Sequence, residues 1–223
     1  MKAGLMMQAL LKGVSGLIAA MVLLFVPAGT FSYKNGWLFI AFLFIPMIVF
    51  GAFLLAKAPK LLEKRLHTRE SQSEQKLVIL LSSLLFVAVF VIAGLDYRFG
   101  WTKVPTAVVA LGAVLLLTGY GMYMEVMREN AWLSRTVEIQ EDQKVIDTGL
   151  YGLVRHPMYL ATIILFLAMP LVLGSWISFV LMLLYPVVLV KRITGEEKVL
   201  EEGLPGYIEY KKKVKYRLFP FIW

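Results

Sequence analysis

The segment that decides the fold is LVILLSSLLFVAVFVIAGL, residues 77–95, nineteen residues without one charged side chain. A helix needs about 20 apolar residues to cross the hydrocarbon core of a bilayer. Lipid offers no hydrogen-bond partner to a bare backbone, so a helix is the structure expected for such a segment. The segment therefore predicts a membrane-spanning helix and an all-α integral membrane protein.

Five further apolar segments lie outward from this one along the chain. They cover residues 14–25 (with 26–31 as an extension), 37–55, 104–124, 159–173 and 176–190. The last two are shorter and are separated by Pro170 and Gly174, which predicts a tight C-terminal helical hairpin that is tilted or crosses incompletely. We expect a polytopic bundle of about five to six membrane helices.

Composition excludes several classes of protein and of site. The chain has 223 residues, of which 59% are hydrophobic and 17% charged, too apolar for a water-soluble globule or a disordered chain. With no cysteine and two histidines, it offers neither disulfides nor a thiolate or multi-histidine metal site. We attribute the net charge of +8 to basic loops facing anionic lipid, and expect neither a metal nor a nucleic-acid partner.

Charge predicts the orientation. If the N-terminus is cytoplasmic and all six segments cross, the outer loops hold only Lys34, Arg98 and Lys103 among 23 lysines and arginines. Cytoplasmic loops carry the excess of basic residues in membrane proteins. We therefore expect a multi-pass protein with both termini cytoplasmic, and the membrane that we expect is a prokaryotic cell membrane.

Polar groups are densest after residue 127, which suggests N-terminal transmembrane helices at 1–127 and a catalytic region at 128–223. Arg155 and His156 precede Pro157, a residue suited to the first turn of a helix. A helix N-terminus beside a guanidinium can bind a carboxylate or phosphate, and Tyr159 could share its face. An interfacial Arg/Tyr anchor is an equally good interpretation of these positions alone.

Three other groups allow two interpretations each. Arg192 and Glu196, four residues apart, favour a solvated helical ion pair, although Glu196 and Glu197 could bind a cationic ligand group. Tyr207 and Tyr210 precede a basic run, which suits a helix on anionic lipid or a lid over a site. Gly119 and Gly121 indicate close helix packing or a ligand against the backbone.

Two series of motifs resemble the isoprenylcysteine carboxyl methyltransferase family. The first is SRTVEIQ (134–140), QKVIDTGLY (143–151) and VRHPMY (154–159); the second is EEKVL (196–200), LPGYIEY (204–210) and YRLFP (216–220). The glycine pair and the glutamate pair also resemble those of phospholipid N-methyltransferases, which belong to the wider superfamily.

The resemblance implies methyl transfer from S-adenosylmethionine, at a cytosolic pocket, to a lipophilic acceptor: a small molecule, a prenylated compound or a lipid. On this resemblance Arg192 orients an acceptor carboxylate, and Glu196 holds the acceptor or the cofactor. The positions expected to bind the cofactor are Gln140, Gly149, Leu150, Tyr151, Val154, Arg155, His156, Tyr159, Glu197, Tyr207 and Tyr210.

Two other functions remain open at this point. One is a membrane reductase resembling sterol reductases, which would bind NADPH; its pyrophosphate needs cations, whereas Glu196 and Glu197 favour a cationic cofactor. The other is a non-catalytic transporter or assembly protein. Glu125 is the only acid within a predicted segment, which weakens the transporter interpretation.

Overall fold

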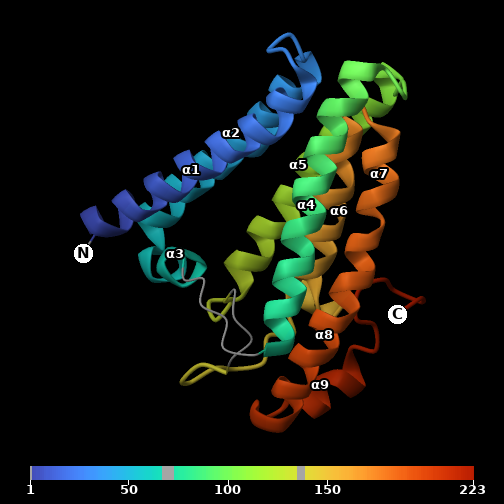
Figure 1. The fold of residues 1–223 in the computed structure, drawn as a ribbon. Coiled ribbons are helices and arrows are strands. Elements are labelled where there is room, and N and C mark those ends of the chain that lie inside the picture. Colours follow the sequence, from blue (N-terminus) through green and yellow to red (C-terminus); the bar gives the residue numbers. More distant parts are fainter. Residues whose placement is uncertain (1, 67–72, 135–138) are drawn as a thin grey trace.

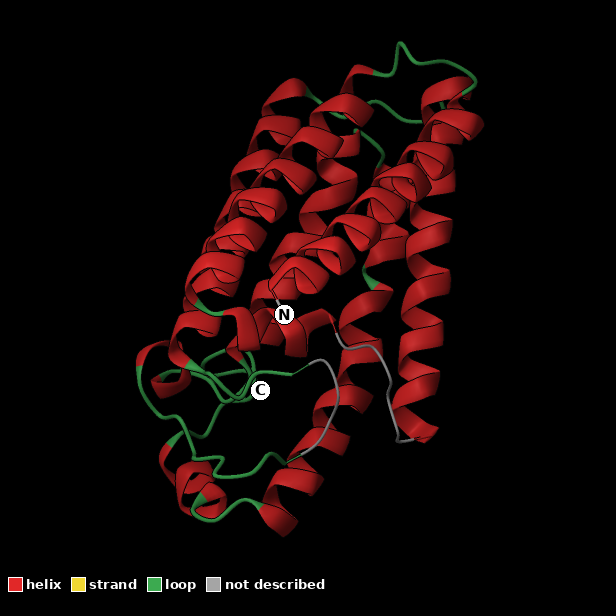
Figure 2. Ribbon diagram, turned by 90° about the vertical axis from the view of Figure 1, so that its left-hand side faces the viewer, coloured by secondary structure: helices red, strands yellow, loops and turns green. Residues whose placement is uncertain are grey.

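The computed structural model describes residues 2–66, 73–134 and 139–223, and these residues form helices joined by loops, with no strand among them (Figures 1 and 2). The all-α prediction is confirmed. In chain order the helices are α1 (Lys2–Ala28), α2 (Lys34–Lys57), α3 (Pro59–Leu66), α4 (Ser73–Phe99), α5 (Thr106–Glu129), the 3-10 helix η1 (Gly149–Gly152), α6 (Pro157–Leu173), α7 (Trp176–Met182), α8 (Leu184–Gly203) and α9 (Tyr207–Lys213).

Within the described residues, five helical stretches are long and apolar enough to cross a membrane. They are α1, α2, α4, α5 and the continuous stretch Trp176–Gly203 formed by α7 and α8, and α6 adds a shorter apolar helix of 17 residues. The prediction of a polytopic bundle with about five to six membrane helices is therefore confirmed.

The loops after α1, α4 and α6 meet at one end of the bundle, called here the Ser175 end. The Tyr33 hydroxyl donates to the Leu173 carbonyl at 2.5 Å, and the Ser175 hydroxyl donates to the Asp96 carboxylate at 2.5 Å. Because these bonds join the far end of α6 to the ends of α1 and α4, α6 runs the full length of the bundle. The opposite end, where α6 begins, is called the Arg155 end (Figure 1).

The helices that could cross a membrane also contain acids outside the predicted apolar segments, and Asp96 is the most buried of those that the structure describes. Asp96 lies in α4, one residue beyond the predicted apolar segment, and is 1% exposed. Its carboxylate accepts hydrogen bonds from the hydroxyls of Ser175 and Thr102 and from the Thr102 amide. These bonds satisfy the buried charge and connect α4 with the loops before α5 and α7.

Close packing of α5 on α6 places the N-terminal end of α6 against the loops of the Arg155 end. A Cβ on Gly119 would lie 2.9–3.0 Å from atoms of Leu165, and one on Gly112 would lie 2.8 Å from Leu171 Cβ. The two glycines are seven residues apart, so they share one face of α5. Gly121, by contrast, has open space around its missing side chain. Of the predicted glycine pair, only Gly119 serves helix packing.

We expect Gly119→Ala to destabilise the protein by about 1–3 kcal/mol, because the added methyl group overlaps the backbone of Leu165 and must push α6 away. The matched control is Gly121→Ala, two residues along the same helix, with an expected change within about 0.5 kcal/mol. Unfolding of the detergent-purified variants, followed by circular dichroism, measures both. An equal loss in the two variants would contradict this packing role.

The N-terminal pair α1 and α2 packs on the other helices at the Ser175 end and diverges from them toward the Arg155 end (Figure 1). A cluster including Leu24, Phe39, Leu116 and Val172 forms the core shared by this pair with α5 and α6. Farther along, α2 and α3 face α5 across an apolar groove of about 1140 Å³.

Candidate functional site

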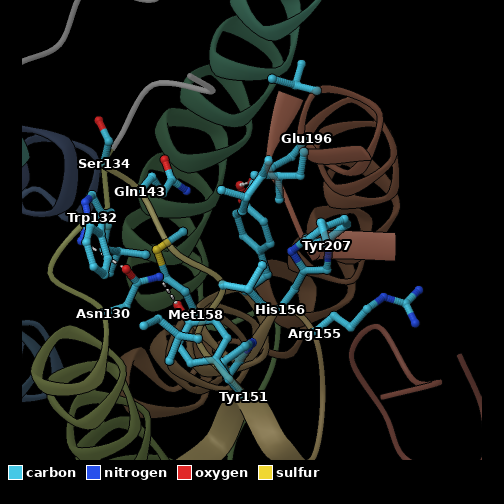
Figure 3. Close-up of a pocket in the computed structure, with 18 of the residues that line it drawn as sticks. Asn130, Trp132, Ser134, Gln143, Tyr151, Arg155, His156, Met158, Glu196 and Tyr207 are labelled. Atoms are coloured by element: carbon cyan, nitrogen blue, oxygen red, sulfur yellow. Dashed lines mark hydrogen bonds between the residues drawn. The ribbon is translucent and has the colours of Figure 1, made fainter. Parts of the chain in front are cut away.

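A polar cavity lies at the Arg155 end, enclosed by the loop after α5, η1, the first turn of α6, the end of α8 and α9 (Figure 3). Proline at the first position of α6 begins the helix there, as predicted. The αL conformation of Gly206 (φ 85°) allows the chain to turn from α8 into α9 across the cavity. Two local sequence signals therefore fix where α6 begins and where the chain turns from α8 into α9.

The cavity brings together side chains that lie far apart in the sequence. Of the residues predicted to form the site, it is lined by Tyr151, Arg155, His156, Tyr159, Arg192, Glu196 and Tyr207. The other predicted site residues, Gln140, Gly149, Leu150, Val154, Glu197 and Tyr210, do not line it. The rings of His156 and Tyr159 lie 5.7 Å apart, so the predicted shared face is confirmed.

The Tyr159 hydroxyl connects Arg192 with Glu196. It donates to the Glu196 carboxylate and accepts from Arg192 Nε at 3.2 Å. Arg192 is only 9% exposed, so the interpretation of Arg192 as part of a solvated surface pair, which spacing alone favoured, is wrong. The same helical spacing instead places the two side chains on either side of one buried hydroxyl.

Glu197 is the most enclosed charge in this region, at 2% exposed. Its Oε1 atom accepts from Arg155 Nε at 2.7 Å and lies 3.3 Å from His156 Nε2, and its Oε2 atom accepts from Arg217 Nε at 2.8 Å. Glu197 therefore binds side chains from the start of α6 and from the C-terminal segment. Both of its oxygens are already used by protein groups.

Arg155 points away from the cavity, toward the C-terminal segment (Figure 3). Besides Glu197, its guanidinium donates through Nη1 to the carbonyls of Val214 and Lys215, at 2.8 and 2.7 Å. The backbone amides of Arg155 and His156 donate to the carbonyls of Tyr216 and Arg217. These contacts hold the C-terminal segment against the start of α6, and two of the guanidinium nitrogens are committed to them.

Tyr207 has a hydroxyl without a hydrogen-bond partner among the described residues, although the residue is 4% exposed and lines the cavity. Burial, followed by the charges of Glu197 and Glu196, raises the pKa of this hydroxyl above its ordinary value. The group therefore stays protonated and remains a donor. An unpaired buried donor is uncommon in a folded protein, so this hydroxyl is available to an acceptor.

Helix α9 lies over one side of the cavity with tyrosines facing inward and lysines exposed on its outer surface. Tyr207 and Tyr210 are buried, their rings lie 5.8 Å apart, and the Tyr210 hydroxyl donates to the Tyr151 carbonyl at 2.7 Å. Lys212 and Lys213 are exposed. The two interpretations of this segment, a basic surface helix and an aromatic lid, are therefore compatible.

The predicted residues that do not line the cavity support its walls. Gln140 accepts from Lys64 Nζ and donates to the Trp132 carbonyl, which ties α3 to the loop after α5. Gly149 adopts φ 54° beside Glu129, a backbone conformation that favours glycine, and Leu150 packs in the cluster that includes Tyr151. Val154 is buried and donates to the Leu150 carbonyl. Residues 135–138 of the first motif lie outside the described residues.

The loop after α5 contributes lining residues that sequence reasoning missed: Asn130, Trp132, Leu133, Ser134, Gln143, Lys144, Val145 and Ile146. Asn130 donates to the Tyr151 hydroxyl at 2.9 Å and accepts from the Trp132 amide at 3.0 Å. An asparagine directly after a helix is a common turn-forming signal. That signal could have located this wall of the cavity.

A second hollow of about 490 Å³, called here the α4–α6 groove, adjoins the cavity. Its walls are mostly apolar and come largely from α4, α6 and α8, including Ile79, Phe86, Phe166 and Leu189. Ser134, Met158, Tyr159 and Arg192 line both hollows. The Tyr159–Arg192 pair therefore stands where the polar cavity meets an apolar groove.

Comparison with known proteins gives partial matches. Residues 107–204, from α5 to just beyond α8, form a domain that matches the phospholipid methyltransferase family. A curated relative, the Delta(14)-sterol reductase TM7SF2 of Mus musculus, is 30% identical over 91 residues. That match covers 40% of this chain and 22% of the mouse protein, so the chain spans about a fifth of this relative's length.

Proposed function

We propose that this protein is an S-adenosylmethionine-dependent methyltransferase of the membrane, similar to isoprenylcysteine carboxyl methyltransferases, that methylates the carboxylate of a lipophilic acceptor. The main observation in support of this function is that the polar cavity meets the α4–α6 groove at Tyr159 and Arg192. The junction lies within the segment that matches a methyltransferase family. The proposal includes the orientation predicted from charge, with both termini and the cavity on the cytoplasmic side.

Several groups of the cavity support this cofactor. Glu196 would hold the ammonium group, and the unpaired Tyr207 hydroxyl would donate to a ribose or carboxylate oxygen. Tyr151 and His156 are aromatic walls against which an adenine or a sulfonium packs favourably. We assign Glu197 a positioning role, because its oxygens are bound by three cationic or imidazole groups.

The enclosed volume, about 100 Å³, lies below the range of about 300–1,000 Å³ usual for ligand pockets. A ligand of cofactor size therefore requires part of the wall to move outward. Gln143, Lys144 and Ile146 lie in no helix, so their displacement breaks no helical hydrogen bonds. The proposal places the movement in this loop.

S-adenosylmethionine, when bound, supplies an electrophilic methyl group on a sulfonium. A carboxylate acceptor is ionised at pH 7 and needs no general base. Arg192 would orient that carboxylate, and the Tyr159 hydroxyl would keep Arg192 and Glu196 in place. The apolar walls of the groove and the cover of α9 would exclude competing water.

The direct test is methylation of S-farnesylcysteine by the detergent-purified protein, with the methyl group of the cofactor labelled. The matched control acceptor is the same compound with its carboxylate converted to a carboxamide. We expect a base-labile labelled ester from the acid and no product from the amide. Equal labelling of both compounds would contradict carboxylate methylation.

Tyr207→Phe should change cofactor affinity and stability in opposite directions. Removing a buried hydroxyl that lacks a partner should stabilise the cofactor-free protein by about 1 kcal/mol. The same change should weaken cofactor binding by about fivefold, because one donor to the ligand is lost. Unfolding and calorimetric titration measure the two effects. A variant that is less stable but binds the cofactor normally would show that the hydroxyl does not face the ligand.

A reductase is the second candidate, because the mouse relative is a sterol reductase. The cavity disfavours a nicotinamide dinucleotide, since Arg155 already uses two guanidinium nitrogens on protein groups and Glu196 would repel a pyrophosphate. Saturable binding of NADPH by the purified protein would favour the reductase.

A further inference from the structure

The groove between α2–α3 and α5, called here the α2–α5 groove, takes no part in the proposed chemistry. It is a hollow of about 1140 Å³ with apolar walls that include Phe50, Phe53, Met124 and Met127. Trp132 lines both this groove and the cavity, whereas four residues are shared by the cavity and the α4–α6 groove. The α2–α5 groove is therefore separate from the acceptor's path.

Cations gather at one end of this groove. Lys57, Lys60, Lys64 and Arg128 line it together with a single acid, Glu125. Arg128 is paired with Glu125 at 2.7 Å and with Glu129 at 3.0 Å, which neutralises the one carboxylate of the lining. Lys64 donates to Gln140 and to the Ala131 carbonyl, which leaves its charge without an acid among these partners. An apolar trough with excess positive charge at one end matches an anionic lipid.

The groove also has room for a chain. Gly121 lines it and has no atom within 4 Å of the position that a Cβ would take. Gly112 and Gly119, the other two glycines of α5, are instead in close contact with α6. The open stretch beside Gly121 lies between the divergent α2 and α5, on helices long enough to cross a membrane (Figure 1). An acyl chain entering sideways from the bilayer would meet this face.

We propose that the α2–α5 groove binds an anionic phospholipid that is not the methyl acceptor. Its acyl chain lies beside Gly121 among the phenylalanines and methionines, and its phosphate lies at Lys57 and Lys60, with Lys64 nearby. The bound lipid fills the space between α2 and α5 and supports Trp132 from behind the cavity wall. Binding at this site does not depend on the proposed methyl transfer.

The test is lipid binding by the full-length protein in detergent, with bound lipid counted by native mass spectrometry. The probes are dioleoyl phosphatidylglycerol and dioleoyl phosphatidylcholine. We expect the anionic lipid to bind more tightly. Lys57→Ala/Lys60→Ala should weaken phosphatidylglycerol binding by roughly thirtyfold and weaken phosphatidylcholine binding less, because the choline group offsets the charge of its phosphate.

Two further variants distinguish lipid binding in the groove from nonspecific attraction of an anionic lipid to a basic protein. Lys191→Ala/Lys198→Ala removes two exposed lysines of α8 that line no part of the groove, and should leave phosphatidylglycerol binding unchanged. Gly121→Leu fills the groove while keeping its cations, and should weaken binding of both lipids. Circular dichroism confirms that each variant is folded.

Three results of the binding measurements would overturn the proposal. They are equal binding of the two lipids by the wild type, an equal loss in the two double-lysine variants, and full retention of phosphatidylglycerol by Gly121→Leu. Transfer of the labelled methyl group to either lipid would identify the groove's occupant as an acceptor and would also overturn it. If the protein does not methylate S-farnesylcysteine, the proposed function fails, but the lipid-binding measurement still tests this second proposal.

Discussion

Glu197→Ala should destabilise the protein by about 3–5 kcal/mol, the largest stability effect that we expect from one substitution. Removing one partner of a buried ion pair leaves the other charge without compensation. Here the loss would leave Arg155 and Arg217 without their carboxylate and would take one contact from His156. The C-terminal segment would then lose the link from Arg217 to Glu197, and would keep the bonds of Arg155 and His156 to its backbone carbonyls.

The matched control is Glu201→Ala, a short distance along α8. Glu201 pairs with Lys211 in a partly exposed position, so its loss should cost at most about 1 kcal/mol. Thermal unfolding in detergent compares the two variants, and limited proteolysis reports release of the C-terminal segment. If Glu197→Ala unfolds like the wild type, the triple contact of Glu197 contributes no stability, and its positioning role is wrong.

Arg192→Lys should lower turnover by about 10²–10³-fold, the largest expected effect on activity. Lysine keeps the charge but loses the planar pair of donors that can orient a carboxylate. Loss of one donor that orients or stabilises the reacting group typically has an effect of this size. Since Glu196 and Tyr207 are untouched, cofactor affinity should stay within about threefold of wild type.

Lys191→Ala, at the neighbouring exposed position, is the control for this effect and should retain full turnover. Methylation kinetics and calorimetric titration of the cofactor separate the two roles of the site. A folded Arg192→Lys variant with normal turnover would show that Arg192 only supports the structure. A variant that loses cofactor binding as strongly as turnover would place Arg192 in the cofactor subsite.

The membrane helices could be predicted because apolar length alone determines them, and the structure adds residues at their ends. The largest differences are at the first segment, predicted to begin at residue 14, whereas α1 begins at Lys2, and at the sixth, predicted to end at residue 190, whereas α8 continues to Gly203. The charged residues Arg192, Glu196 and Glu197 interrupt the apolar pattern, and such an interruption predicts the end of a membrane segment. In the structure these side chains are paired inside the protein, so the helix continues through them.

Adjacent residues on a helix point about 100° apart, and sequence alone could not show which direction faces the cavity. Glu196 contacts Tyr159 in the cavity, whereas Glu197 contacts Arg155 and Arg217 behind it. The same argument separates Gly119, which faces α6, from Gly121, which faces the α2–α5 groove. Contacts such as Arg155 with the Val214 carbonyl join distant segments and have no local signal.

The central claim is that the cavity at the Arg155 end binds S-adenosylmethionine through Glu196. Calorimetric titration of the detergent-purified protein with S-adenosylmethionine and its demethylated product tests it most directly. We predict saturable binding to the wild type, a loss of about ten- to a hundredfold in Glu196→Gln, and normal binding in Glu201→Gln. A folded wild-type protein that binds neither compound, or a Glu196→Gln variant that binds both as tightly as the wild type, would contradict the claim.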